Sequence, residues 1–230
     1  MENFKIIFER EKKKYLLQDN NIIHNFFNYI LNDILEDYKI SYIFYSLLKD
    51  KFIDNQENIL QLSLVINIYF IMIDIIFNLP SCLDQDKTNK TASIHKVFNE
   101  TITTLGIMFS INHLTKIHLQ ILDKMDTKKT DIINKILPIF DKNVTLINDN
   151  IEDEDINNIL DNTKNKKNIL IKIRIERKKK YLEGLLKYVE ILDSRNIFSE
   201  EKYNSLCNIL SINNTNENNI NESIINCLRI

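Results

Sequence analysis

Glycine and proline are scarce in this chain, whose 230 residues include only 2 of each. Hairpins, bulges and tight turns depend on these two residue types, so their scarcity argues against a large β-protein. Phosphate-binding loops need several glycines close together, and the chain has only Gly106 and Gly184, far apart in the sequence. This excludes the glycine-rich loops that bind ATP, GTP and dinucleotides.

Cysteine is also scarce, and neither sign of charge dominates. Cys82, Cys207 and Cys227 show no metal-ligand spacing, and an odd number without a pairing pattern fits a reducing compartment, so we expect a cytoplasmic protein. The first residues mix charged with apolar side chains and lack the pattern of a secretory signal. The formal charge of −2 gives no reason to expect nucleic acid or an acidic membrane as a partner.

Apolar residues are abundant, at 44% of the chain, and recur at helical spacing along most of it. The spacing predicts helices over about 4–16, 22–35, 40–48, 59–77, 93–122, 130–148 and 171–192. We therefore predict an all-α protein with a single helical domain over residues 1–210. Residues 211–230 follow as a polar, low-complexity connector that ends in a short apolar tail.

The apolar run at 59–77 is long enough to cross a membrane. It contains Asn67 and Asp74, however, and an aspartate at the centre of a membrane helix costs roughly 2.5–3.5 kcal/mol. We therefore predict a helix at the centre of a soluble bundle and no transmembrane span. Pro80 should end this helix, because the residue before a proline is pushed out of helical geometry.

Few residues suggest catalysis or metal binding. His113 and His118 are five positions apart, so they do not share a helical face as paired metal ligands would. The acidic run at 152–155 predicts the start of a helix, although it could also bind a cation loosely. No serine or cysteine lies in a nucleophile motif. We predict no catalytic residues and no metal ligands.

Residues 77–98, FNLPSCLDQDKTNKTASIHKVF, follow the apolar run and carry a family likeness. Leu79-Pro80, the later His95-Lys96-Val97-Phe98 and then Glu100 resemble, in order and spacing, the first aspartate-rich region of the trans-isoprenyl diphosphate synthases, the geranylgeranyl and farnesyl diphosphate synthase family. Tyr38-Lys39 lies near the place of that family's Gly-Lys-x-x-Arg motif. The resemblance covers about residues 12–150 and implies a helical bundle of the isoprenoid synthase type, shortened at the C-terminus.

The residues that the family uses for catalysis are replaced here. In the resembling alignment its metal-binding aspartates fall on Phe77, Asn78 and Leu83, and its arginine pair falls on Thr88 and Asn89. For the second diphosphate site, Lys39 matches the family's lysine, but the positions of its arginine and histidine hold Tyr42 and Phe70. A second aspartate-rich motif has no counterpart. These groups hold Mg²⁺ and neutralise the diphosphate, so their loss is difficult to reconcile with synthase activity.

The resemblance therefore implies a catalytically degenerate relative rather than an enzyme. We expect a non-catalytic or regulatory subunit of isoprenoid biosynthesis that pairs with an active prenyl diphosphate synthase or with itself, and that has no cofactor. Two alternatives stay open. The first is a prenyltransferase with residual or altered activity that uses Mg²⁺ with Asp84, Asp86 and Lys39. The second is an unrelated helical interaction protein whose likeness is coincidental.

In the resembling family, subunits pair through the helices that follow the first aspartate-rich loop, which here correspond to about 97–122 and 129–149. The apolar residues of the first of these helices are spread too widely for burial on one side alone. We expect the interface to include Val97, Ile102, Leu105, Met108 and Phe109. Gly106 fits either a close approach of another backbone or packing within the chain.

Overall fold

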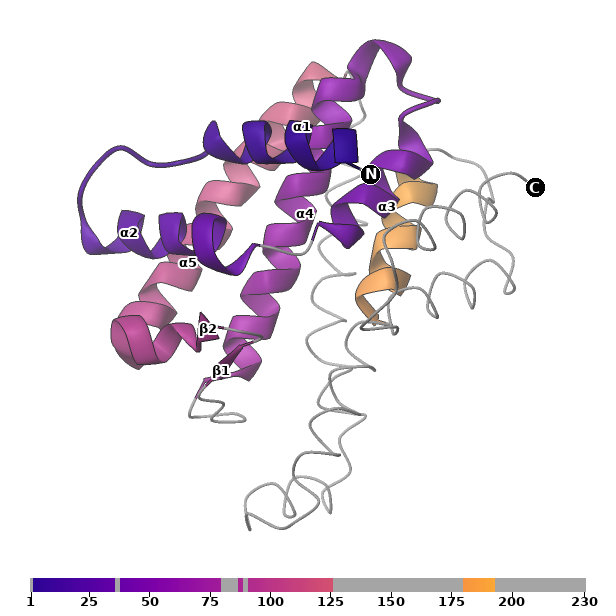
Figure 1. The fold of residues 1–230 in the computed structure, drawn as a ribbon. Coiled ribbons are helices and arrows are strands. Elements are labelled where there is room, and N and C mark those ends of the chain that lie inside the picture. The colour runs from indigo at the N-terminus through magenta and orange to yellow at the C-terminus, as the bar shows by residue number, and fades with distance from the viewer. Residues whose placement is uncertain (1, 36–37, 80–86, 89–90, 126–179, 193–230) are drawn as a thin grey trace, which may run out of the picture. The chain divides into compact units, whose positions relative to one another are not determined.

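The computed structural model describes residues 2–35, 38–79, 87–88, 91–125 and 180–192 (Figure 1). The chain divides into two compact units, Met1–Thr127 and Lys128–Ile230, which are described separately. Most of the described residues are helical, which confirms the all-α fold class. The predicted helix at 130–148 and the connector and tail at 211–230 lie outside the described residues.

The first unit is a set of helices joined by short connections. Its elements are α1 (Glu2–Lys13), α2 (Ile22–Tyr29), the π-helix η1 (Ile30–Ile34), α3 (Lys39–Leu48), the 3-10 helix η2 (Ile53–Asn55), α4 (Gln56–Phe77), β1 (Lys87–Thr88), β2 (Thr91–Ala92) and α5 (Ile94–Lys124). The two strands pair antiparallel within the connection between α4 and α5, where the sequence predicted only a polar loop. They are two residues long and leave the fold class unchanged.

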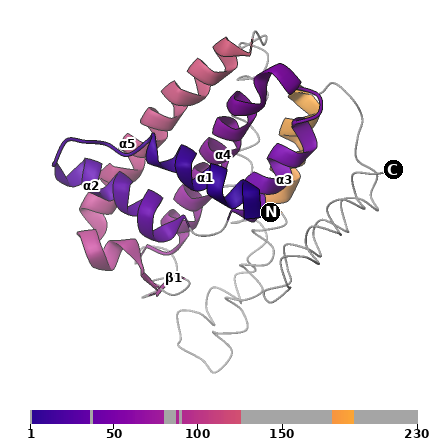
Figure 2. The ribbon, with the colours of Figure 1, turned by 45° about the horizontal axis from the view of Figure 1, so that its top comes forward.

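Helix α4 lies at the centre of this unit, as the sequence predicted. It packs against α3, α5 and α1, and Figures 1 and 2 show α5 running beside it and α1 crossing it. Most of its side chains are buried on every side of the helix, which explains why its apolar residues show no single face. The helix ends at Phe77, where the N–H of Asn78 donates to the carbonyl oxygens of Asp74 and Ile75 at 3.2 and 3.1 Å.

By length and composition alone, Ile53–Phe77 could also cross a membrane. Within its most apolar window, however, 72% of the residues are buried inside the chain. Burial of this kind is what the core helix of a soluble protein requires. It favours the interpretation of α4 as a core helix, and the absence of a transmembrane span stays a prediction.

Helix α5 was expected to be continuous, but it is broken at Asn99. This residue has φ 59° and ψ 167°, a backbone conformation that residues other than glycine rarely adopt. The Asn99 side-chain oxygen accepts a hydrogen bond from the N–H of Ile102 at 2.9 Å, and the Thr103 hydroxyl donates to the Asn99 carbonyl oxygen at 2.6 Å. Asn99 therefore acts as an N-cap for the longer segment that follows.

Two earlier helices also differ from the sequence prediction. The helix predicted at about 4–16 ends at Lys13, so Tyr15 and Leu16 lie beyond it. The helix predicted at 22–35 begins at Ile22, capped by Asn21, but widens into a π-helix after Tyr29, where the Leu35 N–H donates to the Ile30 carbonyl oxygen at 2.9 Å. A single wide turn of this kind is too short to be recognised from the spacing of apolar residues.

Gly106 serves the packing of α2 on α5. A Cβ atom at this position would lie 2.4 Å from Cδ1 of Phe26, far closer than van der Waals contact between two carbon atoms allows. Phe26 is fully buried, and its ring also meets Phe98 edge-on at a centroid distance of 5.6 Å. Of the two roles considered for Gly106, the structure therefore shows packing within the chain.

The second unit contributes one described helix, at residues 180–192, which belongs to the helix predicted over 171–192. Its apolar side chains from Tyr181 to Leu192 are largely buried. Lys180 forms an ion pair with Glu183 one turn later, at 3.2 Å.

Candidate functional site

The C-terminal end of α4 is where the resemblance places metal-binding aspartates. Phe77, Asn78 and Leu79 are 7%, 4% and 7% exposed, so all three side chains are packed into the interior. Of these residues, Phe77 and Asn78 stand where the resemblance places aspartates. A phenylalanine side chain offers no oxygen to a metal ion, and hard cations such as Mg²⁺ need several oxygen ligands. Leu83, Asp84, Asp86 and Asn89 lie outside the described residues, and Thr88 pairs with Thr91 in the short ribbon. Within the described ranges, no group of three or more His, Cys, Asp or Glu residues could hold a metal ion.

Lys39, the predicted substrate-binding residue, is the first residue of α3 and is half-buried. The two tyrosines closest to it in the sequence, Tyr38 and Tyr42, belong to an aromatic cluster that joins α1 to α3. Phe4 is the centre of this cluster, with its ring 5.2 Å from that of Tyr42 and 6.3 Å from that of Tyr38. Tyr42 thus serves packing, at a position where the resembling family places an arginine.

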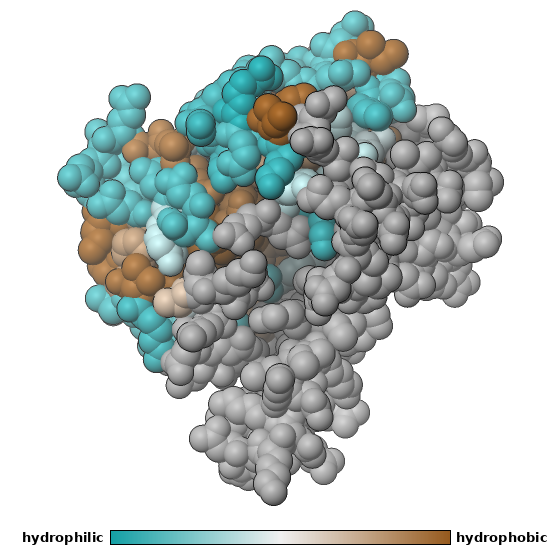
Figure 3. All heavy atoms as spheres, viewed as in Figure 1, coloured by the Kyte–Doolittle hydropathy of each residue, from teal (hydrophilic) through white to brown (hydrophobic). Residues whose placement is uncertain are grey.

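Helix α5 presents an apolar face to the outside. Val97, Leu105 and Met108 are 47%, 49% and 59% exposed, whereas Ile107 and Leu114 on the opposite side are buried. Hydrophobic atoms gather on the surface over α2 and the beginning of α5 (Figure 3).

The other two predicted interface residues are partly used within the chain. Ile102 and Phe109 are half-buried. The Phe109 ring stacks on His113 at a centroid distance of 5.7 Å and lies 5.3 Å from the ring of His24. The predicted apolar face of α5 is therefore centred on Val97, Leu105 and Met108.

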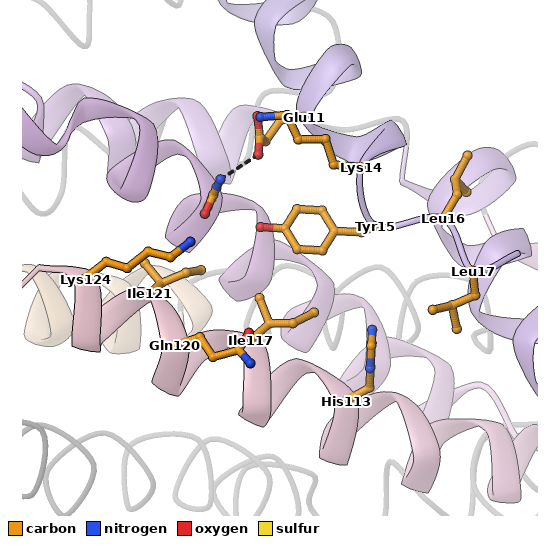
Figure 4. Close-up of a pocket in the computed structure, with 11 residues that line it drawn as sticks. Glu11, Lys14, Tyr15, Leu16, Leu17, His113, Ile117, Gln120, Ile121 and Lys124 are labelled. Atoms are coloured by element: carbon orange, nitrogen blue, oxygen red, sulfur yellow. Dashed lines mark hydrogen bonds and ion pairs between the residues drawn. The ribbon is translucent and has the colours of Figure 1, made fainter.

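A pocket that the sequence did not predict opens beside the first third of α4 (Figure 4). Its volume is about 370 Å³, within the range of small-molecule sites. Three parts of the first unit form its walls: the end of α1 with the loop that follows, one residue of α4, and the C-terminal half of α5. The lining residues are Glu11, Lys14, Tyr15, Leu16, Leu17, Gln61, His113, Ile117, Gln120, Ile121 and Lys124.

One wall of this pocket is a closed polar network around Glu11. The Glu11 side chain is 1% exposed, and its two oxygens accept from the Gln61 amide and the Lys14 ammonium, each at 2.8 Å. Lys14 also binds Glu57 of α4 at 2.9 Å. Hydrogen bonds to Glu11 and Glu57 raise the pKa of Lys14, and the hydrogen bond from Lys14 lowers the pKa of Glu57. The network fastens the end of α1 to α4 through one ammonium that is shared by two carboxylates.

Tyr15 and His113 are neutral groups in the pocket. Burial raises the pKa of Tyr15, and the charges of Glu11 and Glu57 raise it further, so the phenol keeps its proton. Burial lowers the pKa of His113, as do the nearby His24 and Lys116, so the imidazole is uncharged at neutral pH. Figure 4 shows the Tyr15 hydroxyl pointing along the pocket toward Lys124.

One feature of the sequence bears on this pocket. Asn21 is the N-cap of α2, so the preceding residues form a connection rather than a longer first helix. Asn28 of α2 then holds Leu17 of that connection through two hydrogen bonds, to its N–H at 2.9 Å and its carbonyl oxygen at 2.8 Å. The approach of this connection to α5 is a tertiary contact, which local sequence patterns do not encode.

Comparison with known proteins adds no assignment. No model of a known protein family matches the chain, and a search of curated proteins found no significant match.

Proposed function

We propose that this chain is a non-catalytic subunit that binds a second protein through the outer face of α5, and that the partner is an active prenyl diphosphate synthase. The observation that carries the proposal is the exposure of Val97, Leu105 and Met108 on that helix. Exposed apolar side chains grouped on one element are typical of protein interaction sites. The sequence resemblance supplies the identity of the partner.

The packing at the end of α4 supports the non-catalytic part of this proposal. Phe77 fills interior space at a position where a synthase of the resembling family has a carboxylate for Mg²⁺. Asn78 forms the helix C-cap with its backbone. Without such carboxylates, the charge on a departing diphosphate is left unstabilised, and this stabilisation is usually the largest contribution to catalysis.

Affinity purification from the organism of origin tests the pairing. The tagged chain should co-purify with a synthase that carries both aspartate-rich motifs, and the isolated pair should condense isopentenyl diphosphate with an allylic diphosphate in the presence of Mg²⁺. The chain alone should show no turnover. Turnover by the homogeneous chain that is lost on changing Asp84 or Asp86 would instead favour a prenyltransferase with residual activity.

The face itself is tested by a matched pair of variants. Met108→Glu places a charge at the centre of the α5 face and should abolish pairing. Ile53→Glu is the control, because Ile53 is also a large, exposed apolar residue, 69% exposed against 59% for Met108, but lies on η2. Both variants should keep the helical circular dichroism signal. Equal loss of pairing in both, or in neither, would rule out the α5 face as the interface.

A further inference from the structure

The pocket beside Gln61 lies far from the place where the resemblance puts a substrate. Residues 61 and 77 both belong to α4 and are separated by 16 positions, which is roughly 24 Å along a helix. A ligand in this pocket would therefore occupy a different site from the one that Phe77 fills. Its chemistry follows from the groups that line it.

The polar groups of the pocket fall into two sets. The carboxylate of Glu11 is saturated by Gln61 and Lys14, and Lys14 already has two carboxylate partners, Glu11 and Glu57. The groups of this set that line the pocket therefore already have partners, and Glu57, the second carboxylate bound to Lys14, does not line the pocket. In the part of the chain that the structure describes, the Lys124 ammonium has no ion-pair partner, and the Tyr15 phenol and the Gln120 amide make no hydrogen bond.

The second set favours an anion. Lys124 supplies a positive charge, and Tyr15 supplies an O–H donor because burial keeps its phenol protonated. Gln120 lies one helical turn before Lys124 on α5, so both residues are on the side of that helix that lines the pocket. A carboxylate accepts hydrogen bonds from donors of all three kinds.

The rest of the lining is apolar or uncharged. Leu16 and Leu17 come from the connection after α1, and Ile117 and Ile121 come from α5. The ring of His113 is neutral and is held edge-on against Phe27 at a centroid distance of 5.3 Å. These surfaces suit a short aliphatic or aromatic body and offer nothing to a second charge.

From this arrangement we propose that the pocket binds a small organic monocarboxylate with an apolar body. The carboxylate binds Lys124, Tyr15 and Gln120, and the body lies against Leu17, Ile117 and Ile121. The proposal depends neither on the partner protein nor on the resemblance, since every group in it belongs to the first unit of this chain.

Hexanoate is a suitable probe, with 1-hexanol, hexylammonium and acetate as its comparisons. Hexanoate and 1-hexanol share the apolar body and differ in charge, hexylammonium reverses the charge, and acetate keeps the carboxylate without the body. Titrations of the purified full-length chain followed by amide NMR shifts give both affinity and location. We expect saturable binding of hexanoate, at least about tenfold tighter than that of the other three, with shifts at residues 14–17 and 117–124.

Variants locate the charge and the hydroxyl. Lys124→Met keeps the aliphatic stem and should reduce hexanoate affinity about tenfold without changing that of 1-hexanol, and Tyr15→Phe should reduce it by a smaller factor. Lys5→Met is the control, because Lys5 is an exposed lysine of α1 that does not line the pocket. Equal affinities for hexanoate and 1-hexanol, no saturable binding of hexanoate, or the same loss in Lys5→Met and Lys124→Met would each overturn the proposal.

Discussion

The two ends of α4 differ in their surroundings: side chains fill the space around its C-terminal end, which we call the closed end, whereas a pocket lies beside its N-terminal part, which we call the open end. At its C-terminal end, Phe77, Asn78 and Leu79 are almost fully buried. Near its beginning, Gln61 faces a pocket of about 370 Å³. The difference follows from the side chains that surround each place. Apolar side chains can fill interior space completely, whereas the polar side chains around the pocket, among them the exposed Gln120 and Lys124, leave space between them.

This contrast also bears on function. The end of α4 where a family likeness suggests a catalytic site is filled by the chain itself. At the other end, for which the sequence predicted no site, Tyr15, Gln120 and Lys124 line a pocket with hydrogen-bond donors that have no partner among the described residues. Substitutions at the closed end should therefore affect stability, and substitutions at the open end should affect binding.

The largest effect is expected for Phe77→Asp at the closed end. This change restores the acidic residue type that the resemblance places here, but it buries a charge in a space shaped for a ring. We expect a loss of about 4 kcal/mol or more in the free energy of unfolding, measured by urea denaturation, and no gain of Mg²⁺-dependent activity. Phe77→Leu should cost much less, about 1 kcal/mol. A stable Phe77→Asp variant would show that this end is open after all.

Between the two ends, His118 should make stability depend on pH. It is 8% exposed on α5, and burial lowers its pKa to about 4. Between about pH 6.5 and pH 4 the unfolded chain takes up a proton at this histidine and the folded chain does not, so the free energy of unfolding falls as the pH falls. The full difference is at most about 3 kcal/mol.

Urea denaturation at pH 7 and pH 4.5 measures this effect. His118→Gln should lose less stability than the unmodified chain over the same pH range. His113→Gln is the comparison: burial also lowers the pKa of His113, but this residue is only half-buried, so its replacement should change the pH dependence less than His118→Gln does. A His118→Gln chain with the unmodified pH dependence would contradict the assignment.

A smaller effect is expected where α2 meets α5. Gly106→Ala gains helix propensity, about 1 kcal/mol, but places a methyl group against the buried ring of Phe26. Overpacking of this kind costs typically 1–3 kcal/mol, so we expect a net loss of about 1 kcal/mol by urea denaturation. Phe26→Leu should make the added methyl group less costly. A double variant whose loss equals the sum of the single losses would show that the two residues do not share this contact.

The smallest effects are expected at the open end. Tyr15→Phe and Lys124→Met remove polar groups that have no hydrogen-bond partner among the described residues. Each should change the free energy of unfolding by less than about 0.5 kcal/mol, as surface substitutions usually do. Losses of 2 kcal/mol or more in urea denaturation would mean that the pocket is a packed part of the core.

Much of the fold could be predicted from the sequence because apolar periodicity is a local property. The helix around Ile59–Phe77 and its central place followed from a long apolar run with few polar interruptions. The beginning of α2 followed from the apolar run that starts at Ile22, and α3 was predicted to within one residue. These features depend on neighbours three and four positions away.

The departures depend on single residues or on distant contacts. The break at Asn99 arises from one residue with positive φ inside an otherwise helical pattern. Helix α1 ends earlier than predicted. Beyond its end, the backbone N–H and carbonyl oxygen of Leu17 form hydrogen bonds with the Asn28 side chain of α2. The candidate pocket joins residues near position 15 to residues near position 120. No local pattern specifies such a contact, whereas the apolar surface of α5 followed from counting residues around one helix.

The break at Asn99 also has a consequence for the direction in which α5 presents its surface. Val97 precedes the break, whereas Leu105 and Met108 follow it, so a single backbone conformation sets the orientation of one part of the apolar face relative to the other. The shape of that face is therefore adjustable without any change in the residues that form it. Replacement of Asn99 by a residue that favours ordinary helical angles would straighten α5 and turn Val97 away from its present direction, while the composition of the surface stayed the same.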